Sequence, residues 1–303
     1  MFGRTLDLEK SYGERVAVTP RQYALHFLHE GTINSHGAMI GTACLYEGLP
    51  MYYDAVNEGG LAIAGLNFPG CAHYRTATGR KHRVASYELI WWVLGQCETV
   101  AQARTLLAQT DVTPESVDPT LPCTPLHWII ADRDACIVAE PVEDGLRIYD
   151  NPVGVMTNAP AFPYHMTRLS DYMSMGAMPP QNQLCPGVEL PYYTRGLGAM
   201  GLPGDWSSVS RFVRAVFVAR HTEKGAEPTQ EIERFFRVMD AVSIPSGCVR
   251  TERGEAVGTI YTCCIDIVQG IYHYHTLDAR AIRSACLHHC NLKTDQITVY
   301  PMK

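Results

Sequence analysis

Apolar segments of two different periods follow one another in blocks along this chain, and that order limits the folds it can adopt. Four short runs rich in β-forming residues come first, at 23–28, 38–46, 50–55 and 61–68. The Asn/Gly turn at 57–60 predicts a hairpin between the last two runs. Residues 86–97 and 99–108 then carry apolar side chains at helical spacing, which predicts a pair of helices.

The second half of the chain repeats this block order. Short strands are expected at 126–132, 135–140, 146–149, 153–157, 257–268, 270–275 and 296–300. Helices are expected at 162–175, 207–221, 229–242 and 279–289. Because strands and helices do not alternate singly, the order favours an α+β fold with antiparallel sheets over a doubly wound parallel sheet.

Two segments are expected to be irregular. Residues 110–125 are rich in Pro, Thr and Asp, which predicts a loop. Residues 176–205 are rich in Gly and Pro, and a loop of that length in a compact domain is usually functional or mobile. No repeat or clear linker interrupts the 303 residues, so we expect one domain, 1–303.

Composition excludes several classes of function. The hydrophobic share is 46%, which suits a chain with a real core, and the formal net charge is −6. The chain has no basic excess to hold a phosphate backbone, so we expect no nucleic-acid partner. No apolar run approaches the length of a membrane helix, and the N-terminal residues lack the apolar core of a secretory signal, so no membrane role is expected. The eleven scattered cysteines then fit reduced thiols in a cytoplasmic protein.

Two motifs resemble a cofactor site or a metal site, but each has a structural interpretation that we favour. Residues 196–201 match a dinucleotide-binding glycine pattern, yet no strand precedes them and Pro203 follows, so a glycine-rich loop is favoured. Cys286, His288, His289 and Cys290 could hold zinc only with a distant second pair such as Cys263 and Cys264, and a polar helix end is the favoured alternative.

A nucleophilic serine and a histidine base are also disfavoured. His127 lies within an apolar strand, where a histidine with satisfied hydrogen bonds in the core is more common than a general base. The chain contains no Gly-x-Ser-x-Gly motif, which disfavours an α/β-hydrolase serine.

Four fragments place polar residues where a simple core would exclude them. Arg4 and Asp7 flank a leucine, and Arg211 follows a helix start among apolar neighbours. Asn67 and Asn158 each end an apolar strand, where an amide or a neighbouring backbone N–H could face a developing oxyanion. An Asx turn is the alternative at both asparagines.

Taken together, these fragments resemble the choloylglycine hydrolase family, which includes bile salt hydrolases and penicillin V acylases. The resemblance spans nearly the whole chain, and its motifs occur in family order: FGRTLD, PMYYDAVNEGGLAIAGLNFPG, LHWII, MTNAP, GLGAMGLPGDWSSVSRFVRA and GTIYTCC. It implies a four-layer αββα fold of the N-terminal nucleophile type. In that family an N-terminal cysteine attacks an amide, and its own α-amino group is the base.

The resemblance also implies roles for the five residues. Arg4 matches the arginine beside the thiolate, and Asp7 matches the aspartate that holds the α-amino group. Asn67 and Asn158 match the asparagines of the oxyanion region, and Arg211 matches a supporting arginine. Penicillin V acylases tend to carry tyrosine at the position of Asn67, so the asparagine favours bile salts.

One departure concerns the nucleophile. In the family, the cysteine lies on a strand that precedes FGR, whereas here Met1 directly precedes Phe2 and the first cysteine is Cys44. We therefore expect the chain to be truncated at its N-terminus relative to the family, with the first strand missing, an exposed sheet edge and no hydrolysis by these 303 residues.

The expected function is hydrolysis of glycine- or taurine-conjugated bile salts to free bile acid and amino acid, with no metal or organic cofactor. The alternatives are a penicillin V acylase and a catalytically dead homologue that binds steroid amphiphiles. The resemblance further implies a homotetramer in the cytoplasm of a gut bacterium, and a loop at 184–201 that lies over the amide end of the substrate.

Overall fold

Two antiparallel sheets form the centre of the protein, as described by a computed structural model for residues 1–76, 79–118, 120 and 122–302. The larger sheet has the order β12 (Gly145–Asp150), β11 (Cys136–Val142), β10 (Leu126–Ala131), β7 (Ala62–Asn67), β6 (Leu49–Asn57), β5 (Met39–Tyr46), β2 (Arg15–Thr19) and β17 (Thr298–Pro301). The smaller sheet has the order β1 (Thr5–Leu8), β14 (Ala256–Asp266), β15 (Ile271–Thr276) and β16 (Arg283–Cys286), with β13 (Val249–Arg250) paired to β14.

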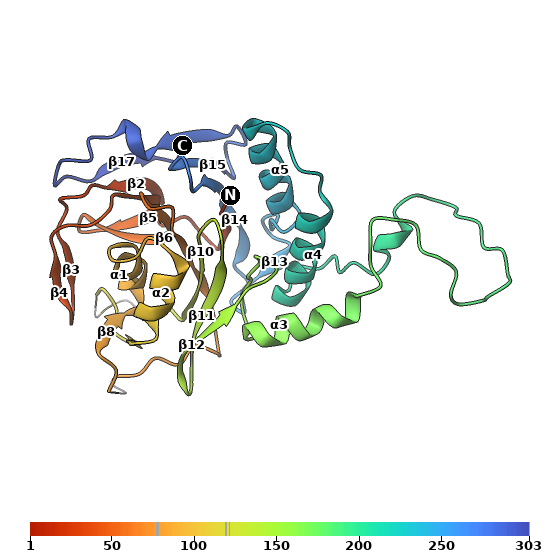
Figure 1. Cartoon of the computed structure of the whole chain (residues 1–303), viewed down its shortest axis with the longest axis horizontal. Helices are drawn as coiled ribbons and strands as arrows, with labels where there is room; N and C mark the ends of the chain where they lie inside the picture. The colour runs from red at the N-terminus through yellow and green to blue at the C-terminus, as the bar shows by residue number, and fades with distance from the viewer. Residues whose placement is uncertain (77–78, 119, 121, 303) are drawn as a thin grey trace.

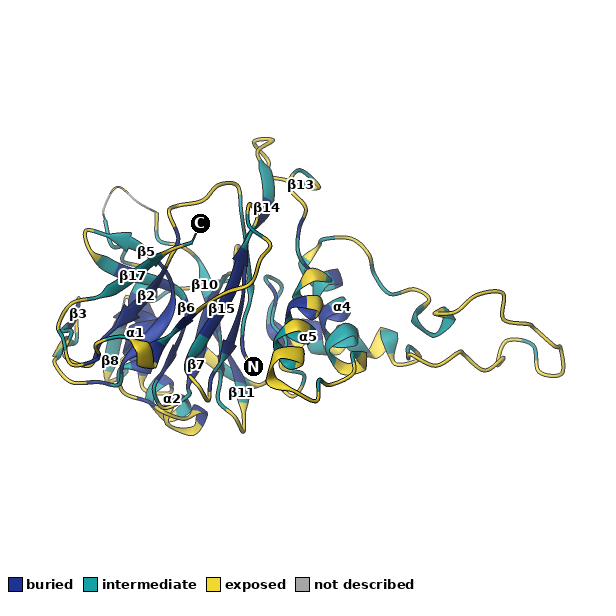
Figure 2. Ribbon diagram, turned by 90° about the horizontal axis from the view of Figure 1, so that it is seen from above, coloured by how far each residue is buried: buried dark blue, intermediate teal, exposed yellow. Residues whose placement is uncertain are grey.

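Helices cover the outer face of each sheet. On the larger sheet lie α1 (Leu89–Leu94) and α2 (Val100–Leu107), and on the smaller sheet lie α4 (Ser208–His221) and α5 (Pro228–Asp240). The order of layers is therefore helices, sheet, sheet, helices (Figures 1 and 2). The expected four-layer αββα fold is confirmed.

Strand alternation divides the core of the larger sheet between its two faces. One face packs Met39, Ile63 and Trp128 against the buried side chains of α1 and α2. The opposite face packs Ile40 and Ala64 against apolar residues of β14 and β15. Each buried Leu- or Ile-sized side chain stabilises the fold by roughly 1.5–3 kcal/mol, so both interfaces hold the layers together.

The segment after the larger sheet crosses to the second helical layer. It contains α3 (Phe162–Arg168), whose Phe162 packs with Phe212 of α4 and Val138 of β11. Residues 176–205 then leave the body of the protein as a long irregular arm before the chain returns to α4 (Figures 1 and 2).

Most of the expected elements occur, including the β6–β7 hairpin and both pairs of helices. The strand predicted at 153–157 is wrong. Pro152 has no backbone N–H, Gly154 has φ 69°, and the Asn151 side chain closes a local turn on Val153 and Gly154.

Three other expectations need correction. The segment 279–289 is not a helix, because Arg283–Cys286 pairs with β15 and a single 3-10 turn follows. The loop at 110–125 begins with β9 (Thr110–Thr113), which pairs in parallel with β8 (His82–Ala85). The helix at 162–175 ends at Arg168 and continues as a 3-10 turn. A small hairpin of β3 (Leu25–Phe27) and β4 (Gly31–Ile33) completes the fold.

Replacing Gly41 with alanine should destabilise the fold. A Cβ atom at Gly41, which is buried in β5, would lie 2.0 Å from the Asp54 carbonyl oxygen and 2.7 Å from the Ala55 Cα. Backbone cannot move away cheaply in a packed sheet, so we expect a loss of roughly 1–3 kcal/mol in the free energy of unfolding, measured by urea titration. Gly204→Ala is the control, since nothing lies within 4 Å of its Cβ position. Equal stability of the two variants would contradict this packing.

Candidate active site

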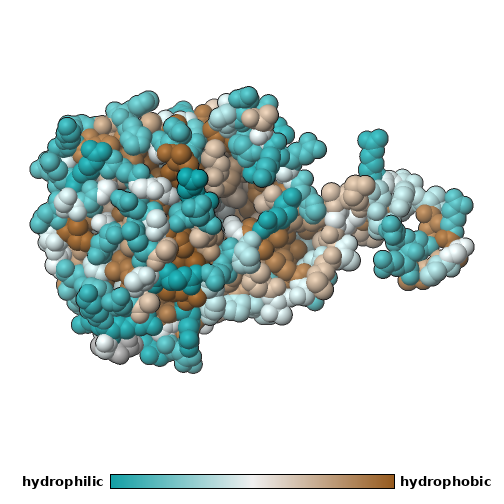
Figure 3. Space-filling view, viewed as in Figure 1, coloured by the Kyte–Doolittle hydropathy of each residue, from teal (hydrophilic) through white to brown (hydrophobic). Residues whose placement is uncertain are grey.

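A cavity of about 1170 Å³ lies between β1, strands of the larger sheet, and helices α4 and α5. Apolar side chains gather in the recess between the sheets and these helices (Figure 3). All five residues singled out in the sequence line the cavity: Arg4, Asp7, Asn67, Asn158 and Arg211. The fold therefore brings together residues that lie up to about 200 positions apart in the chain.

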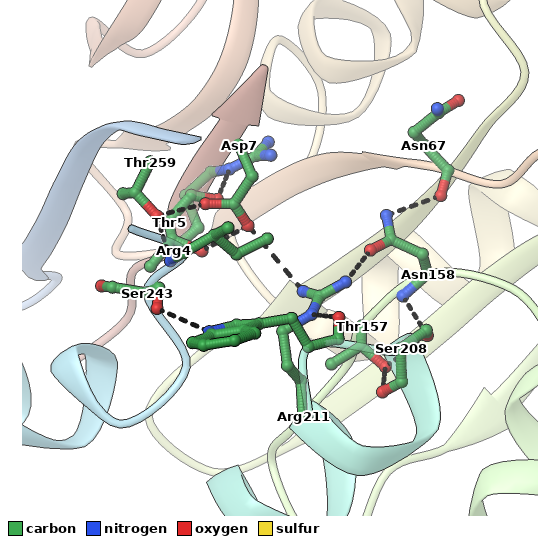
Figure 4. Close-up of polar contacts among 12 residues, drawn as sticks. Arg4, Thr5, Asp7, Asn67, Thr157, Asn158, Ser208, Arg211, Ser243 and Thr259 are labelled. Carbon is green, nitrogen blue, oxygen red and sulfur yellow. Dashed lines mark hydrogen bonds and ion pairs between the residues drawn. The ribbon is translucent and has the colours of Figure 1, made fainter. Parts of the chain in front are cut away.

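Asp7 enters the site from β1, where the pairing register with β14 shifts between Leu6 and Asp7. Its Oδ1 accepts a hydrogen bond from Thr259 at 2.5 Å, and its Oδ2 accepts one from Thr5 at 3.1 Å. Arg211 Nη1 lies 3.8 Å from Asp7 Oδ2, and both side chains are largely buried. The carboxylate is thus oriented by two hydroxyl groups and faces a cation (Figure 4).

Arg211 is placed by the start of α4. Ser207 caps this helix by accepting from the backbone N–H of Ser210, and Asp205 accepts from Ser207 N–H at 2.9 Å and from the Ser210 hydroxyl at 2.6 Å. Arg211 Nε donates to the Trp206 carbonyl at 3.0 Å. Burial lowers the pKa of Arg211, and the Asp7 carboxylate opposes that shift.

Asn158 is held at every polar position. Its backbone N–H donates to Ser208 Oγ at 2.9 Å, and its carbonyl accepts from His165 Nε2 at 2.9 Å. Its side-chain Oδ1 accepts from Arg211 Nη2 at 2.6 Å, and its Nδ2 donates to the Asn67 carbonyl at 2.8 Å. One N–H of the Asn158 amide is used in that last contact, and the other can serve as a donor to a ligand.

Asn67 joins this group through its backbone, because its carbonyl is what Asn158 contacts. The Asn67 side chain is exposed and points away from the Asn158 amide (Figure 4). A continuous polar series therefore runs from Asp7 through Arg211 and Asn158 to Asn67.

Arg4 approaches the same cavity from a different direction. Its Nε donates to the Thr5 carbonyl at 3.1 Å, and its Nη1 donates to the carbonyls of Tyr53 at 3.2 Å and Gly65 at 2.5 Å. Arg4 belongs to the chain that enters the smaller sheet, whereas Tyr53 and Gly65 belong to the larger one. The guanidinium therefore connects the two sheets.

Asp54, which the sequence analysis missed, provides negative charge beside Arg4. This fully buried carboxylate accepts hydrogen bonds from the hydroxyls of Tyr261 and Tyr272. Burial raises the pKa of Asp54, while Arg4 and both tyrosines oppose the shift. For Arg4, burial lowers the pKa, but the surrounding acidic groups, led by Tyr261 and Asp54, outweigh that effect and raise it. An aspartate inside an apolar β-forming run was the available signal, since strands disfavour Asp.

The thiols around the cavity are not activated. Cys136 is the cysteine among the described lining residues, and burial raises its pKa to about 12. Cys263 lies deeper, with Sγ 3.7 Å from Asp54 Oδ1, and burial followed by the nearby Asp54 charge holds its pKa well above the usual value. Because the thiolate is the nucleophilic form, neither group is prepared for attack near neutral pH.

The other motifs take no part in this site. Across the described residues, no group of three or more His, Cys, Asp or Glu side chains could hold a metal, and Cys290 instead lies 3.2 Å from the Tyr300 hydroxyl. The glycine-rich residues 196–201 belong to the arm, where a 3-10 turn spans Leu197–Ala199. In the described part of the chain, no helix is long and apolar enough to cross a membrane.

Comparison with known proteins assigns the family. Residues 1–300 match the sequence model of the linear amide C–N hydrolases, choloylglycine hydrolase family. The chain is 40% identical over 302 residues to a bile salt hydrolase/transferase of Lactiplantibacillus plantarum, covering 100% of this chain and 93% of that protein. It is 32% identical over 303 residues to a conjugated bile acid hydrolase of Lactobacillus gasseri, covering 99% and 95%.

Solved structures agree with this assignment. A mutant of conjugated bile acid hydrolase from Clostridium perfringens superposes with a TM-score of 0.91 at 28% identity, covering 100% of this chain and 93% of that one. Penicillin V acylase from Agrobacterium tumefaciens shares the fold, with a TM-score of 0.77 at 20% identity over 98% and 86% of the two chains. The chain belongs to the choloylglycine hydrolase family, whose members hydrolyse linear amide C–N bonds.

Asp205→Asn should destabilise the protein in a pH-dependent way. Hydrogen bonds from Ser207 and Ser210 lower the Asp205 pKa to about 2. The stabilisation is therefore fully present above the pKa of an unfolded aspartate, roughly 3.9, and is lost as the pH falls toward the folded value. We expect the urea midpoints of the wild type and the variant to differ at pH 7, to approach each other as the pH falls below about 5, and to converge only near the folded pKa of about 2. The exposed Asp278→Asn serves as the control, and a gap of constant size at Asp205 would contradict the role of its charge.

Proposed function

We propose that this protein hydrolyses the amide bond of glycine- or taurine-conjugated bile salts. The observation that carries the proposal is the series Asp7–Arg211–Asn158–Asn67 along one cavity, which holds the Asn158 amide, with one N–H left to donate, beside a buried cation and carboxylate. The names of the bile salt hydrolase relatives support the choice of substrate.

The proposed reaction proceeds through a covalent intermediate. A cysteine thiolate attacks the amide carbonyl, and amide N–H groups of Asn67 and Asn158 stabilise the tetrahedral oxyanion. Collapse expels glycine or taurine, whose nitrogen takes a proton from the cysteine's α-ammonium group. Water then attacks the thioester, which releases the free bile acid and restores the thiol. Asp7 would hold the α-amino group, and Arg4 would lower the thiol pKa.

The thiol for this reaction is not provided by the cysteines described around the cavity, because burial raises the pKa of both Cys136 and Cys263. We propose that a terminal cysteine from outside the 303 residues supplies it. This requirement also favours the second candidate function, binding of a steroid amphiphile without turnover, for the 303 residues alone. A large, mostly apolar cavity can bind such a molecule whether or not a nucleophile is present.

Assays on two forms of the protein separate these candidates. Glycocholate hydrolysis is measured for the 303-residue chain and for protein purified from its natural source, with the N-terminal residue determined by terminal sequencing. We expect hydrolysis by a form that begins with cysteine, and glycocholate binding without hydrolysis by the 303-residue chain. Hydrolysis by that chain would contradict the need for an external thiol. Absence of hydrolysis by both forms would contradict the proposed reaction.

Asn67→Tyr should shift the substrate preference from glycocholate toward penicillin V, because penicillin V acylases tend to carry tyrosine at this position. The substitution leaves the Asn67 carbonyl available to Asn158, because that contact uses the backbone. We expect the ratio of kcat/KM for penicillin V over glycocholate to rise by about tenfold, about 1.4 kcal/mol of discrimination. The exposed Asn291→Tyr is a matched control away from the cavity. An unchanged ratio of the two kcat/KM values would show that Asn67 does not select the substrate.

We also propose that the protein is a cytoplasmic homotetramer. Support comes from the arm at 176–205, which exposes apolar side chains far from the body: Met178 is 78% exposed, Leu184 88% and Tyr193 80%. Exposed apolar surface of this kind is typical of a protein interface. The eleven cysteines are all free, which is consistent with a reducing compartment.

A further inference from the structure

A buried histidine–glutamate pair lies directly behind the two asparagines. His127 on β10 and Glu140 on β11 are 1% and 0% exposed, and they sit one step beyond the paired residues Trp128 and Ala139. Nδ1 of His127 lies 3.0 Å from Oε1 of Glu140. A polar pair buried this completely costs stability unless its hydrogen bonds are complete.

The surroundings of the pair complete those bonds. His127 Nε2 lies 2.8 Å from the Thr157 carbonyl, which can only accept, so this nitrogen carries a proton and donates. Nδ1 faces Oε1 of Glu140 on the opposite side of the ring. Both carboxylate oxygens of Glu140 accept from the backbone N–H of Phe162, at 3.0 and 3.1 Å. The orientation of each side chain in the pair is therefore fixed by a backbone group, the Thr157 carbonyl for His127 and the Phe162 N–H for Glu140.

The His127 ring contacts both of the segments that carry the site asparagines. The His127 ring stacks on Phe68, with ring centroids 4.2 Å apart and planes 8° apart, and Phe68 directly follows Asn67. Thr157, whose carbonyl accepts from the same ring, directly precedes Asn158. One imidazole thus contacts the neighbours of both residues.

Glu140 reaches Asn158 by a second route. Phe162, whose N–H it accepts, is the first residue of α3, and His165 lies within the next turn of that helix. His165 Nε2 donates to the Asn158 carbonyl at 2.9 Å. Burial lowers the pKa of His165, which favours the neutral ring, and the bond to the Asn158 carbonyl requires the proton on Nε2.

We propose that His127 and Glu140 are positioning residues, and that their pairing sets where Asn67 and Asn158 stand relative to each other at the cavity. The pair does not reach the cavity itself, since neither residue is among its described lining. The consequence for turnover rests on the proposed function, but the consequence for the position of Asn158 does not.

Two substitutions of His127 provide the test. A glutamine can place its amide nitrogen near the position of Nε2, within reach of the Thr157 carbonyl, whereas an asparagine reaches only the position of Nδ1. Both remove the stacking on Phe68, so they differ mainly in the bond to Thr157. Glu140→Gln is the conservative partner, because its amide can donate to Nδ1 while its oxygen still accepts from Phe162.

Amide hydrogen exchange at Asn158 is the direct readout, because that N–H donates to Ser208. We expect exchange in His127→Asn to be about tenfold faster or more, and exchange in His127→Gln and Glu140→Gln to stay nearer the wild-type rate. In protein that hydrolyses glycocholate, His127→Asn should lower kcat roughly tenfold to a hundredfold with a smaller change in KM.

A second histidine–glutamate pair is the control. His82 Nδ1 lies 2.8 Å from Glu30 Oε2, and this pair is not part of the cavity lining. His82→Asn is compared with His127→Asn under conditions where both variants have lost the same amount of unfolding temperature. We expect the exchange rate at Asn158 in His82→Asn to equal that of the wild type. Equal exchange at Asn158 in His127→Asn and wild type would overturn the proposal, as would equal effects of His127→Asn and His127→Gln. If the form that begins with cysteine fails to hydrolyse glycocholate, the proposed function fails, and exchange at Asn158 still decides this inference.

Discussion

The guanidinium of Arg4 between the two sheets is the contact on which the arrangement of the site depends. It donates to carbonyls of β6 and β7 while its own chain pairs with β14. A buried cation is costly in an apolar core, and Asp54 provides the nearby negative charge that offsets part of that cost. Because these hydrogen bonds join the two sheets, Arg4 fixes how the chain leading into β1 lies against β6 and β7.

The other polar residues of the site are connected to one another by a series of direct contacts that begins close to Arg4 in the chain. Asp7 lies three residues after Arg4 in β1 and faces Arg211, which the capped start of α4 directs inward. Arg211 in turn holds Asn158, and Asn158 reaches the carbonyl of Asn67 at the end of β7. The layers therefore determine the position of the site, because Asp7, Asn67 and Arg211 lie on β1, β7 and α4, and Asn158 lies in the segment between β12 and α3.

Local patterns in the sequence predicted those elements whose partners are close in the chain. The β6–β7 hairpin follows from its turn, and α4 follows from Asp205 and Ser207 before an apolar helical period. The prediction failed where distant partners decide: Arg283–Cys286 is a strand because β15 offers an edge. The five site residues were found through the family resemblance, since each asparagine alone could equally be explained by an Asx turn at the end of a strand. The contact of His127 with Glu140 could not be predicted, because it depends on the register of β10 against β11.

The central claim is that this polar series serves a thiol that is not among the buried cysteines. The most direct test is alkylation of the glycocholate-hydrolysing protein with iodoacetamide, with the modified residue identified by mass spectrometry as activity falls. The account predicts that activity is lost in step with modification of an N-terminal cysteine, while Cys136 and Cys263 stay unmodified because they are buried or have raised pKa values. Loss of activity that follows modification of Cys136 or Cys263 would contradict it, and so would hydrolysis that survives complete alkylation.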